Sequence, residues 1–211
     1  MQKEDLKKIE KFFEKYDRVV YKKGESILQA DDPAPGIFYL KKGYIRQYII
    51  SQKGEIFVIN IFQPGSFFCM TWAMNGSPNS TYFDTLSTVE AYLAPLEDVR
   101  EFFDKQPALL YDFTKRLLRG VHGLTLRLES LMLEPAYNRT AALLVYLAEK
   151  FGEKNGEGIK IALPFTHKEV ASWIGTTRET ASLQLEEMKK KGIVSYTRRF
   201  LIINNLKKLS S

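Results

Sequence analysis

The 211-residue chain is poor in the residues from which most metal and catalytic sites are built. It contains one cysteine, Cys69, and two histidines, His122 and His167. A single cysteine excludes an internal disulfide framework and a cysteine-rich zinc or iron–sulfur site within one chain. Two histidines in predicted helical regions supply neither the metal cluster of a cupin-type enzyme nor the parts of a catalytic triad. We therefore expect a protein that is not an enzyme.

Long apolar runs are missing as well. No stretch approaches the roughly 18 apolar residues that a membrane-spanning helix needs. The first residues, Met1–Lys8, lack the apolar region of a secretory signal peptide. Because the chain also lacks disulfides, we expect a cytoplasmic protein that has no membrane partner.

Positive charge is present but unevenly distributed. Residues 1–134 contain 18 Lys+Arg and 18 Asp+Glu, whereas residues 135–211 contain 13 Lys+Arg and 7 Asp+Glu. The entire net charge of +6 therefore lies in the last 77 residues. A basic module suits a polyanion, because each neutralised phosphate releases counterions. The alternative is an ordinary solvated face.

The region from residue 19 to residue 95 has the pattern of an antiparallel β domain. Short apolar runs alternate with glycine-containing turns, which is typical of a sandwich or barrel. A short amphipathic helix at residues 3–16 is expected to precede them, and residues 44–50 are expected to form a hairpin with 56–60. The predicted strands are Ser26–Leu28, Gly36–Leu40, Tyr44–Ile50, Ile56–Ile61 and Val89–Ala94.

Residues 108–133 change to a helical period. Apolar residues recur there with gaps of 7, 4, 3, 4 and 3, which is the seam of a two-stranded coiled coil. The alternative is an amphipathic helix packed on its own domain. Pro135 ends this helix, so the predicted regions are 1–107, 108–134 and 135–211. The predicted dimer-interface residues are Leu110, Leu117, Val121, Leu124, Leu128 and Leu131.

The last region predicts a winged helix-turn-helix. A helix at Asn138–Phe151, a polar turn at 152–158 and a strand at Ile159–Leu163 come first. Thr166 and Glu169 then form a capping box, Gly175 ends the first short helix, and Thr177 caps the second. Two strands follow as a wing, at Ile193–Tyr196 and Phe200–Ile203.

Segments of both halves resemble the Crp/Fnr family (cyclic-AMP receptor protein and fumarate-nitrate regulator) of bacterial transcription factors. Glu169–Thr180 is similar to the family's recognition signature, and Asn138–Ala141 to the start of its DNA-binding domain. Phe38–Gly43 and Phe62–Phe67 resemble two turns of its β-roll. The resemblance covers nearly the whole chain. It implies an α+β fold with an N-terminal antiparallel β-roll of the cyclic-nucleotide-binding type, a homodimer, and RNA polymerase as a partner.

Four residues near the start of the second short helix share one face and are expected to read DNA bases. Arginine can bind guanine through two hydrogen bonds, and glutamate can accept from cytosine. The resemblance assigns the same roles to Arg178 and Glu179, whereas many relatives have arginine at the position of Leu183. The alternative for Arg178 and Glu179 is a solvent-exposed ion pair. The predicted base-reading residues are Arg178, Glu179, Ser182 and Leu183.

A second set of polar residues is expected to contact phosphates, which sets position but not sequence preference. His167 has the alternative of being an ordinary exposed residue, and Lys189–Lys191 that of a solvated helix end. A twofold dimer places its two recognition helices about 34 Å apart, so double-stranded DNA with an inverted repeat is the expected partner. The predicted phosphate contacts are Thr166, His167, Thr177, Thr180, Arg198 and Arg199.

The effector is the least determined feature. In relatives that bind cyclic AMP, a glutamate holds the ribose and an arginine the phosphate; here those positions are Met70 and about Ser80. We therefore do not expect cyclic AMP, nor an iron–sulfur cluster or haem, although His122 is one candidate haem ligand. No cofactor is predicted. Cys69 would be a redox switch only if it were exposed with a depressed pKa.

An apolar effector pocket is the remaining possibility on the sensor side. Its alternatives are a plain hydrophobic core and a protein without an effector. A further alternative for the whole chain is a scaffold whose helix-turn-helix contacts protein. The predicted pocket residues are Phe67, Met70, Trp72, Tyr82, Phe83, Leu124 and Thr125.

Overall fold

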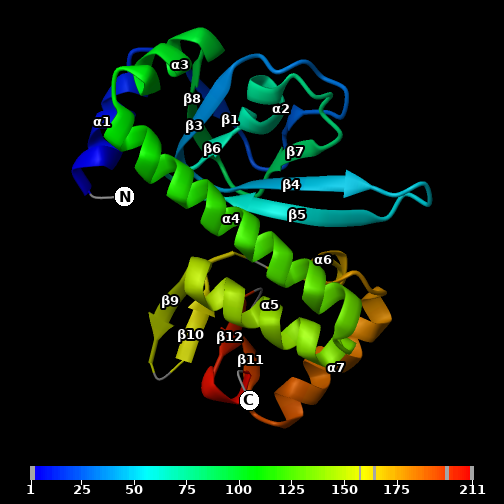
Figure 1. The fold of residues 1–211 in the computed structure, drawn as a ribbon. Helices are drawn as coiled ribbons and strands as arrows, with labels where there is room; N and C mark the ends of the chain where they lie inside the picture. Colours follow the sequence, from blue (N-terminus) through cyan, green and yellow to red (C-terminus); the bar gives the residue numbers. More distant parts are fainter. Residues whose placement is uncertain (1–2, 157, 164, 198–199, 210–211) are drawn as a thin grey trace. The chain divides into compact units, whose positions relative to one another are not determined.

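The computed structural model describes residues 3–156, 158–163, 165–197 and 200–209, which form two compact units. One unit comprises Met1–Ser51 and Val58–His122, and the other comprises Gln52–Phe57 and Gly123–Ser211. The boundary falls inside the long helix α4 (Pro107–Leu133), drawn in green in Figure 1. Gly120 and Gly123 lie at this boundary, and each weakens the helix by about 1 kcal/mol relative to alanine.

The N-terminal unit is a β-roll of two four-stranded antiparallel sheets, as the sequence predicts. The first sheet has the order β1-β8-β3-β6 and the second the order β2-β7-β4-β5. The predicted hairpin is formed by β4 and β5, which project together in Figure 1. The strands are β1 (Arg18–Tyr21), β2 (Ser26–Leu28), β3 (Ile37–Lys42), β4 (Ile45–Ile50), β5 (Ile56–Phe62), β6 (Phe67–Phe68), β7 (Tyr82–Thr85) and β8 (Val89–Ala94).

Three short helices complete this unit, and the sequence predicts the first of them. They are α1 (Lys3–Phe13), α2 (Met70–Asn75) and α3 (Leu96–Asp104). Strand β3 shows how the core is divided, because successive side chains of a strand point to opposite faces. Ile37 and Tyr39 belong to a cluster with α1, α3 and the start of α4, whereas Phe38 and Leu40 belong to the cluster inside the roll. Both faces of β3 are therefore buried.

The roll interior is filled by aromatic rings. Phe38 and Phe68 stack with centroids 4.5 Å apart, and Phe83 lies 5.9 Å from Phe68 and 5.4 Å from Trp72. Offset stacks and tilted pairs of this kind add stability beyond the area that they bury. The resulting core is dense.

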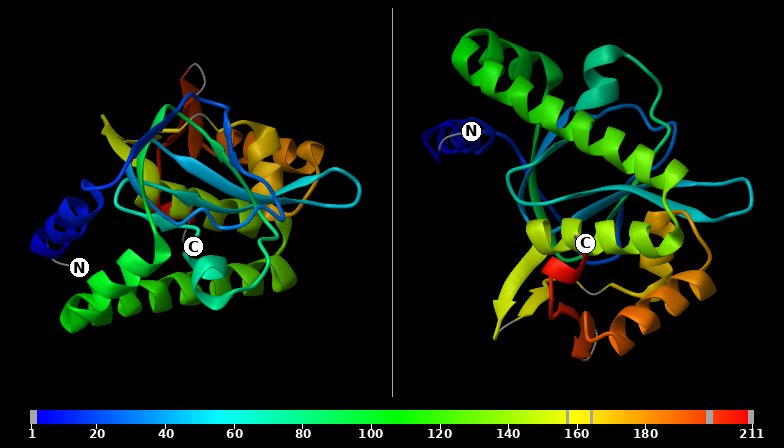
Figure 2. Two further views of the ribbon diagram at one scale, coloured as in Figure 1. Left: turned by 90° about the horizontal axis from the view of Figure 1, so that it is seen from above. Right: turned by 60° about the horizontal axis from the view of Figure 1, so that its bottom comes forward.

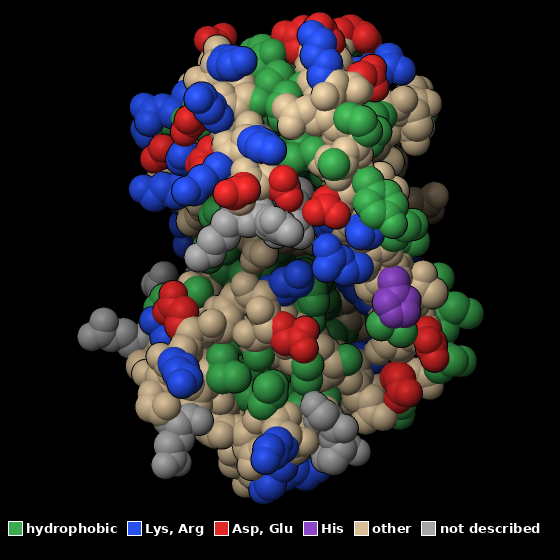
Figure 3. Space-filling model, turned by 60° about the vertical axis from the view of Figure 1, so that its left-hand side comes forward, with side chains coloured by type: hydrophobic (Ala, Val, Ile, Leu, Met, Phe, Trp, Pro, Cys, Tyr) green, Lys and Arg blue, Asp and Glu red, His purple; other side chains and the backbone are tan. Residues whose placement is uncertain are grey.

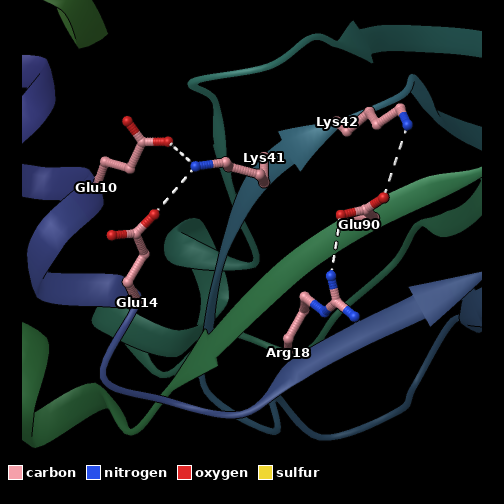
Figure 4. A network of polar contacts seen from close by, with 6 residues as sticks. All are labelled: Glu10, Glu14, Arg18, Lys41, Lys42 and Glu90. Atoms are coloured by element: carbon pink, nitrogen blue, oxygen red, sulfur yellow. Dashed lines mark hydrogen bonds and ion pairs between the residues drawn. The ribbon is translucent and has the colours of Figure 1, made fainter.

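Charged side chains on the roll are matched locally. Figure 3 shows Lys and Arg interspersed with Asp and Glu on the upper part of the molecule. Lys41 binds the carboxylates of Glu10 and Glu14, and these hydrogen bonds raise the pKa of Lys41 (Figure 4). Glu90 lies 3.7 Å from the Lys42 ammonium and 3.4 Å from the Arg18 guanidinium. Such pairs leave little net field on this surface.

The second unit is a winged helix-turn-helix. Helix α5 (Ala136–Phe151) packs with α6 (His167–Ile174) and α7 (Arg178–Lys190) over a sheet of order β11-β12-β10-β9. The wing is β11 (Val194–Thr197) with β12 (Phe200–Ile203), close to its predicted position. A single-turn helix, η1 (Lys207–Leu209), follows. Within the described residues, no helix combines the length and hydropathy needed to cross a membrane.

One prediction in this unit is wrong. The expected polar turn at 152–158 contains β9 (Gly152–Asn155), which pairs with β10 (Gly158–Ile161) as an antiparallel hairpin. The polar residues of β9 give no apolar alternation. Strand β10 lies between β9 and β12 in the sheet, and β9 is held by its pairing with β10. Local sequence does not reveal such pairing.

Candidate nucleic-acid interface

The first helix of the motif begins and ends where the sequence predicts. Thr166 Oγ1 accepts a hydrogen bond from the Glu169 N–H at 3.2 Å, and the Thr166 N–H donates to the Glu169 carboxylate at 2.6 Å. This is a capping box, which satisfies two backbone donors. Gly175 has φ of 63°, a left-handed conformation that glycine adopts without strain, and α6 ends there.

Helix α7 presents a polar face to solvent at its first turns. Thr177 Oγ1 accepts from the Thr180 N–H at 3.2 Å, so α7 begins immediately after Thr177. Arg178 and Glu179 are exposed, and no ion pair joins them among the residues that the structure describes. Leu183 is 69% exposed. Ala181, Leu185 and Met188 are buried on the opposite face. Figures 1 and 2 show the two helices joined by a short turn.

Ser182 and His167 are brought together, and a third residue joins them. The Ser182 hydroxyl donates to the Arg178 carbonyl at 2.8 Å and lies 2.8 Å from His167 Nδ1. On the other side of the ring, the Tyr196 hydroxyl lies 3.3 Å from His167 Nε2. Burial raises the pKa of Tyr196 to about 12, so its hydroxyl stays protonated. Local spacing gives no signal for Tyr196, because its contact depends on how α6, α7 and the wing pack together.

A half-buried arginine on α4 also supports α6. Arg127 Nη2 donates to the Trp173 carbonyl at 2.7 Å, and the guanidinium lies 4.5 Å from the centre of the Trp173 ring. The ring of Tyr146 on α5 lies tilted against Trp173, with the two ring centroids 5.3 Å apart. Burial lowers the pKa of Arg127 to about 10. The contact holds the end of α6 by a cation–π interaction and a charge-assisted hydrogen bond.

Arg139, in the segment that resembles the start of the family's DNA-binding domain, has a structural contact. Its Nη1 donates to the Leu131 carbonyl at 3.1 Å, near the C-terminal end of α4. A cation there satisfies a carbonyl that the helix leaves unpaired and opposes the negative end of the helix dipole.

Two of the basic residues at the end of α7 pair with nearby glutamates. Lys189 lies 3.6 Å from Glu186 within α7, and Lys191, the residue that caps the end of the helix, lies 2.7 Å from Glu187. These pairs favour the solvated helix end over a phosphate site. Arg198 and Arg199 lie outside the described residues.

The predicted seam on α4 is largely exposed. Leu110, Leu117, Val121, Leu124 and Leu128 have exposed fractions between 37% and 58%, whereas Leu109 and Phe113 on the other face are buried. Leu131 is half-buried instead, with Cδ2 3.4 Å from the position that a Cβ on Gly175 would occupy. The seam thus has an exposed apolar row over most of its predicted length.

The predicted effector residues of the N-terminal unit do not share one environment. Phe67 and Met70 pack against the α1 and α3 cluster, Trp72 and Phe83 belong to the roll interior, and Tyr82 stacks on Tyr48 with centroids 5.4 Å apart. A hollow of about 420 Å³ is lined by Met70 together with Met74, Glu97, Val99, Arg100, Glu101, Phe103, Asp104, Leu110 and Phe113. The plain-core alternative fits Trp72 and Phe83.

Four further candidate residues are either exposed on α4 or buried in the roll. Leu124 and Thr125 are exposed on α4, as is His122. Cys69 is buried and has a positive φ of 70°, and its burial raises the pKa of the thiol. A buried thiol of raised pKa does not meet the condition for a redox switch.

Both units of the chain are similar to known protein families. Residues 18–106 match the family model described as cyclic nucleotide-binding domain, and residues 138–211 match the Crp-like helix-turn-helix domain. The chain is 24% identical over 191 residues to the global nitrogen regulator of Synechocystis sp., covering 88% of this chain and 83% of that protein.

Two other proteins are similar to this chain, one in sequence and one in fold. The transcriptional regulator SdrP of Thermus thermophilus is 29% identical over 180 residues, which covers 84% of this chain and 85% of SdrP. A solved structure of the c-di-GMP responsive global regulator CLP of Xanthomonas campestris superposes with a TM-score of 0.80 at 19% identity, over 93% of this chain and 98% of that one. At that identity the likeness to CLP is one of fold.

Proposed function

Since the chain belongs to the Crp/Fnr family of transcription regulators, we propose that it binds an inverted-repeat DNA operator as a homodimer. The observation that carries this proposal is the exposed face of the first two turns of α7. Arg178, Glu179 and Leu183 face solvent there, while the opposite side of the helix is buried in its own domain. A helix presented in this way can enter the major groove without unfolding any of its packing.

The proposed reading of bases rests on side-chain chemistry. Arg178 would donate two hydrogen bonds to guanine, and Glu179 would accept from cytosine. Leu183 offers only apolar contact, which suits a thymine methyl group. Thr166, Thr177 and Thr180 would position the module on phosphates, as would Arg198 and Arg199 of the wing. The thirteen Lys and Arg against seven Asp and Glu in residues 135–211 supply the attraction to the DNA backbone.

The proposed dimer uses the exposed row on α4. A helix on the surface of a monomeric protein rarely exposes so many large apolar residues along one face. A second copy of α4 would bury these residues in a coiled coil. We expect Leu124→Glu to place two carboxylates against each other in the seam and to shift the protein to a monomer in sedimentation experiments. Tyr111→Glu, at an exposed position of α4 that is not part of the seam, is the matched control. An unchanged dimer in the Leu124→Glu protein would contradict the seam.

We propose that the β-roll responds to an effector other than cyclic AMP, or to none. Met70 and Ser80 supply no charge at the positions where the family's cyclic-AMP-binding members use glutamate and arginine, and aromatic rings fill the roll interior. Contact with RNA polymerase is proposed from the family resemblance alone.

Binding to a pool of random duplexes at two salt concentrations tests the proposed function. A regulator should enrich palindromic duplexes and lose affinity steeply as salt rises, because each phosphate contact releases counterions. A scaffold whose helix-turn-helix contacts protein would enrich no sequence and show little dependence on salt.

A further inference from the structure

His167 lies where three elements of the winged unit meet. It is the first residue of α6, and its two ring nitrogens face different partners. Nδ1 is 2.8 Å from Ser182 Oγ on the recognition helix α7, and Nε2 is 3.3 Å from the Tyr196 hydroxyl on the wing strand β11. The imidazole therefore lies between the recognition helix and the wing strand and contacts a side chain of each.

The proton positions follow from counting donors. The Ser182 hydroxyl has one hydrogen, which it donates to the Arg178 carbonyl at 2.8 Å, so it can only accept from His167. Nδ1 must then carry the proton. Nε2 is left as an acceptor, and the Tyr196 hydroxyl donates to it. With the proton on Nε2 instead, Ser182 would have to turn its hydrogen toward Nδ1 and give up the Arg178 carbonyl. Of the two neutral tautomers, the Nδ1–H form alone satisfies all three contacts.

We propose that His167, in its neutral Nδ1–H form, is a positioning residue that fixes the wing to the recognition helix through Tyr196 and Ser182. This inference rests on the proposed function and changes two of its details. Both nitrogens of His167 and the hydrogen of Ser182 are used inside the protein. His167 therefore sets the orientation of α7 rather than donating to a phosphate, and Ser182 holds the bridge rather than reading a base. The residues that face DNA directly are then Arg178, Glu179 and Leu183.

The tautomer of His167 is measurable in the whole protein without DNA. The chain has two histidines, so His122→Gln leaves His167 as the single imidazole, and His167→Gln leaves exposed His122 as the reference. Nitrogen-15 spectra at a pH where imidazole is neutral should show the proton of His167 on Nδ1. His122 should show the Nε2–H form that solvated imidazole prefers. Finding His167 in that same Nε2–H form would overturn the bridge.

Removing the Tyr196 hydroxyl tests the wing side of the bridge. Tyr196→Phe should shift the Nε2 resonance of His167, because its hydrogen-bond donor is gone. Tyr137→Phe is the matched control in the same unit, since the Tyr137 hydroxyl contacts Lys191 at 3.4 Å and not His167. An unchanged Nε2 resonance in Tyr196→Phe would contradict the contact.

Binding to the duplex that the unaltered protein selects from a random pool tests the consequence for DNA. Tyr196→Phe should weaken that binding about 3- to 10-fold, the usual worth of one hydrogen bond. His167→Asn keeps a donor toward Ser182 but is too short to reach Tyr196, so it should cause the same loss. The double variant should lose no more than either single one, since both break one link. The dependence of binding on salt should not change in any of them.

Two further outcomes distinguish failure of the positioning role from failure of the proposed function. If His167→Asn weakens binding and Tyr196→Phe does not, His167 contacts DNA directly and the positioning role is wrong. If the unaltered protein selects no duplex at all, the proposed function fails, and the tautomer measurement still decides the hydrogen-bond network by itself.

Discussion

The β-roll and the winged unit use their charged residues differently. On the roll, Lys41 is matched by Glu10 and Glu14, and Glu90 is shared by Lys42 and Arg18. In residues 135–211 Lys and Arg outnumber Asp and Glu by 13 to 7, and Arg178 points into solvent at the start of α7. A surface whose charges are balanced internally has little attraction for a polyanion, whereas an unbalanced surface has much. The difference locates the proposed DNA interface in one unit.

Their interiors differ too. The roll is filled by stacked rings such as Phe38, Phe68 and Phe83, whereas the core of the winged unit is mainly aliphatic. Each unit also contains one of the two tryptophans, Trp72 in the roll and Trp173 in α6. Tryptophan fluorescence in single-tryptophan variants therefore reports the unfolding of each unit separately.

The largest expected effect is on the stability of the roll. Phe68→Ala should lower the free energy of unfolding reported by Trp72 by about 3–5 kcal/mol, because Phe68 is 2% exposed and its ring contacts three others. Tyr111→Ala, at an exposed position, should change that value by less than about 0.5 kcal/mol. The transition reported by Trp173 should move less than that of Trp72. Equal shifts of both transitions would show that the two units unfold as one.

The next effect concerns DNA recognition. Arg178→Ala should cost about 1–3 kcal/mol of binding to the selected operator and relax the preference at one position of each half-site. Arg100→Ala removes another exposed arginine, from α3 of the roll, and should leave binding unchanged. Competition binding with operators altered at single positions measures both. Equal weakening on every sequence would contradict a base-reading role and would favour a phosphate contact.

A smaller effect is expected at the start of α6. Thr166→Ala should reduce the free energy of unfolding reported by Trp173 by about 1 kcal/mol, because the capping hydrogen bond to the Glu169 N–H is lost. Thr197→Ala on the exposed end of β11 is the control. A loss no larger than that of the control, in denaturant titrations of both variants, would contradict the capping role.

The last and smallest effect concerns the reactivity of the Cys69 thiol. Burial raises the pKa of the Cys69 thiol, so an alkylating reagent at pH 8 should label the folded protein far more slowly than the protein unfolded in denaturant. The time course of mass increase by mass spectrometry measures both rates. Equal rates would show that Cys69 is accessible in the folded protein, which is one of the two conditions for a redox switch.

The sequence predicted the motif of the winged unit in detail because its determinants are local. Thr166, Glu169, Gly175 and Thr177 fix helix ends through contacts within a few residues, and the structure confirms each of them. The long helix and five strands of the roll were also predicted, since their apolar spacing is regular. Strands β1, β6 and β7 were not, because they are short and exist through pairing with distant partners.

The residues that support the recognition helices could not be predicted either, because their contacts also join distant parts of the chain. Arg127 is 46 residues from Trp173, and Tyr196 is 29 residues from His167. No spacing rule links a half-buried arginine to a ring on another helix, or a wing tyrosine to the start of a helix. A short motif indicates which side chains face outward, and tertiary packing determines which of them are already engaged.

The most direct test of the proposed function alters the spacing of the selected operator. Two recognition helices about one turn apart require half-sites on one side of the duplex, so inserting about five base pairs between them should abolish tight binding by the dimer. Inserting about ten base pairs returns both half-sites to the same side of the duplex but leaves them one turn further apart, so it should recover at most part of the affinity. Undiminished binding after the half-turn insertion would contradict a rigid twofold dimer that reads both half-sites together.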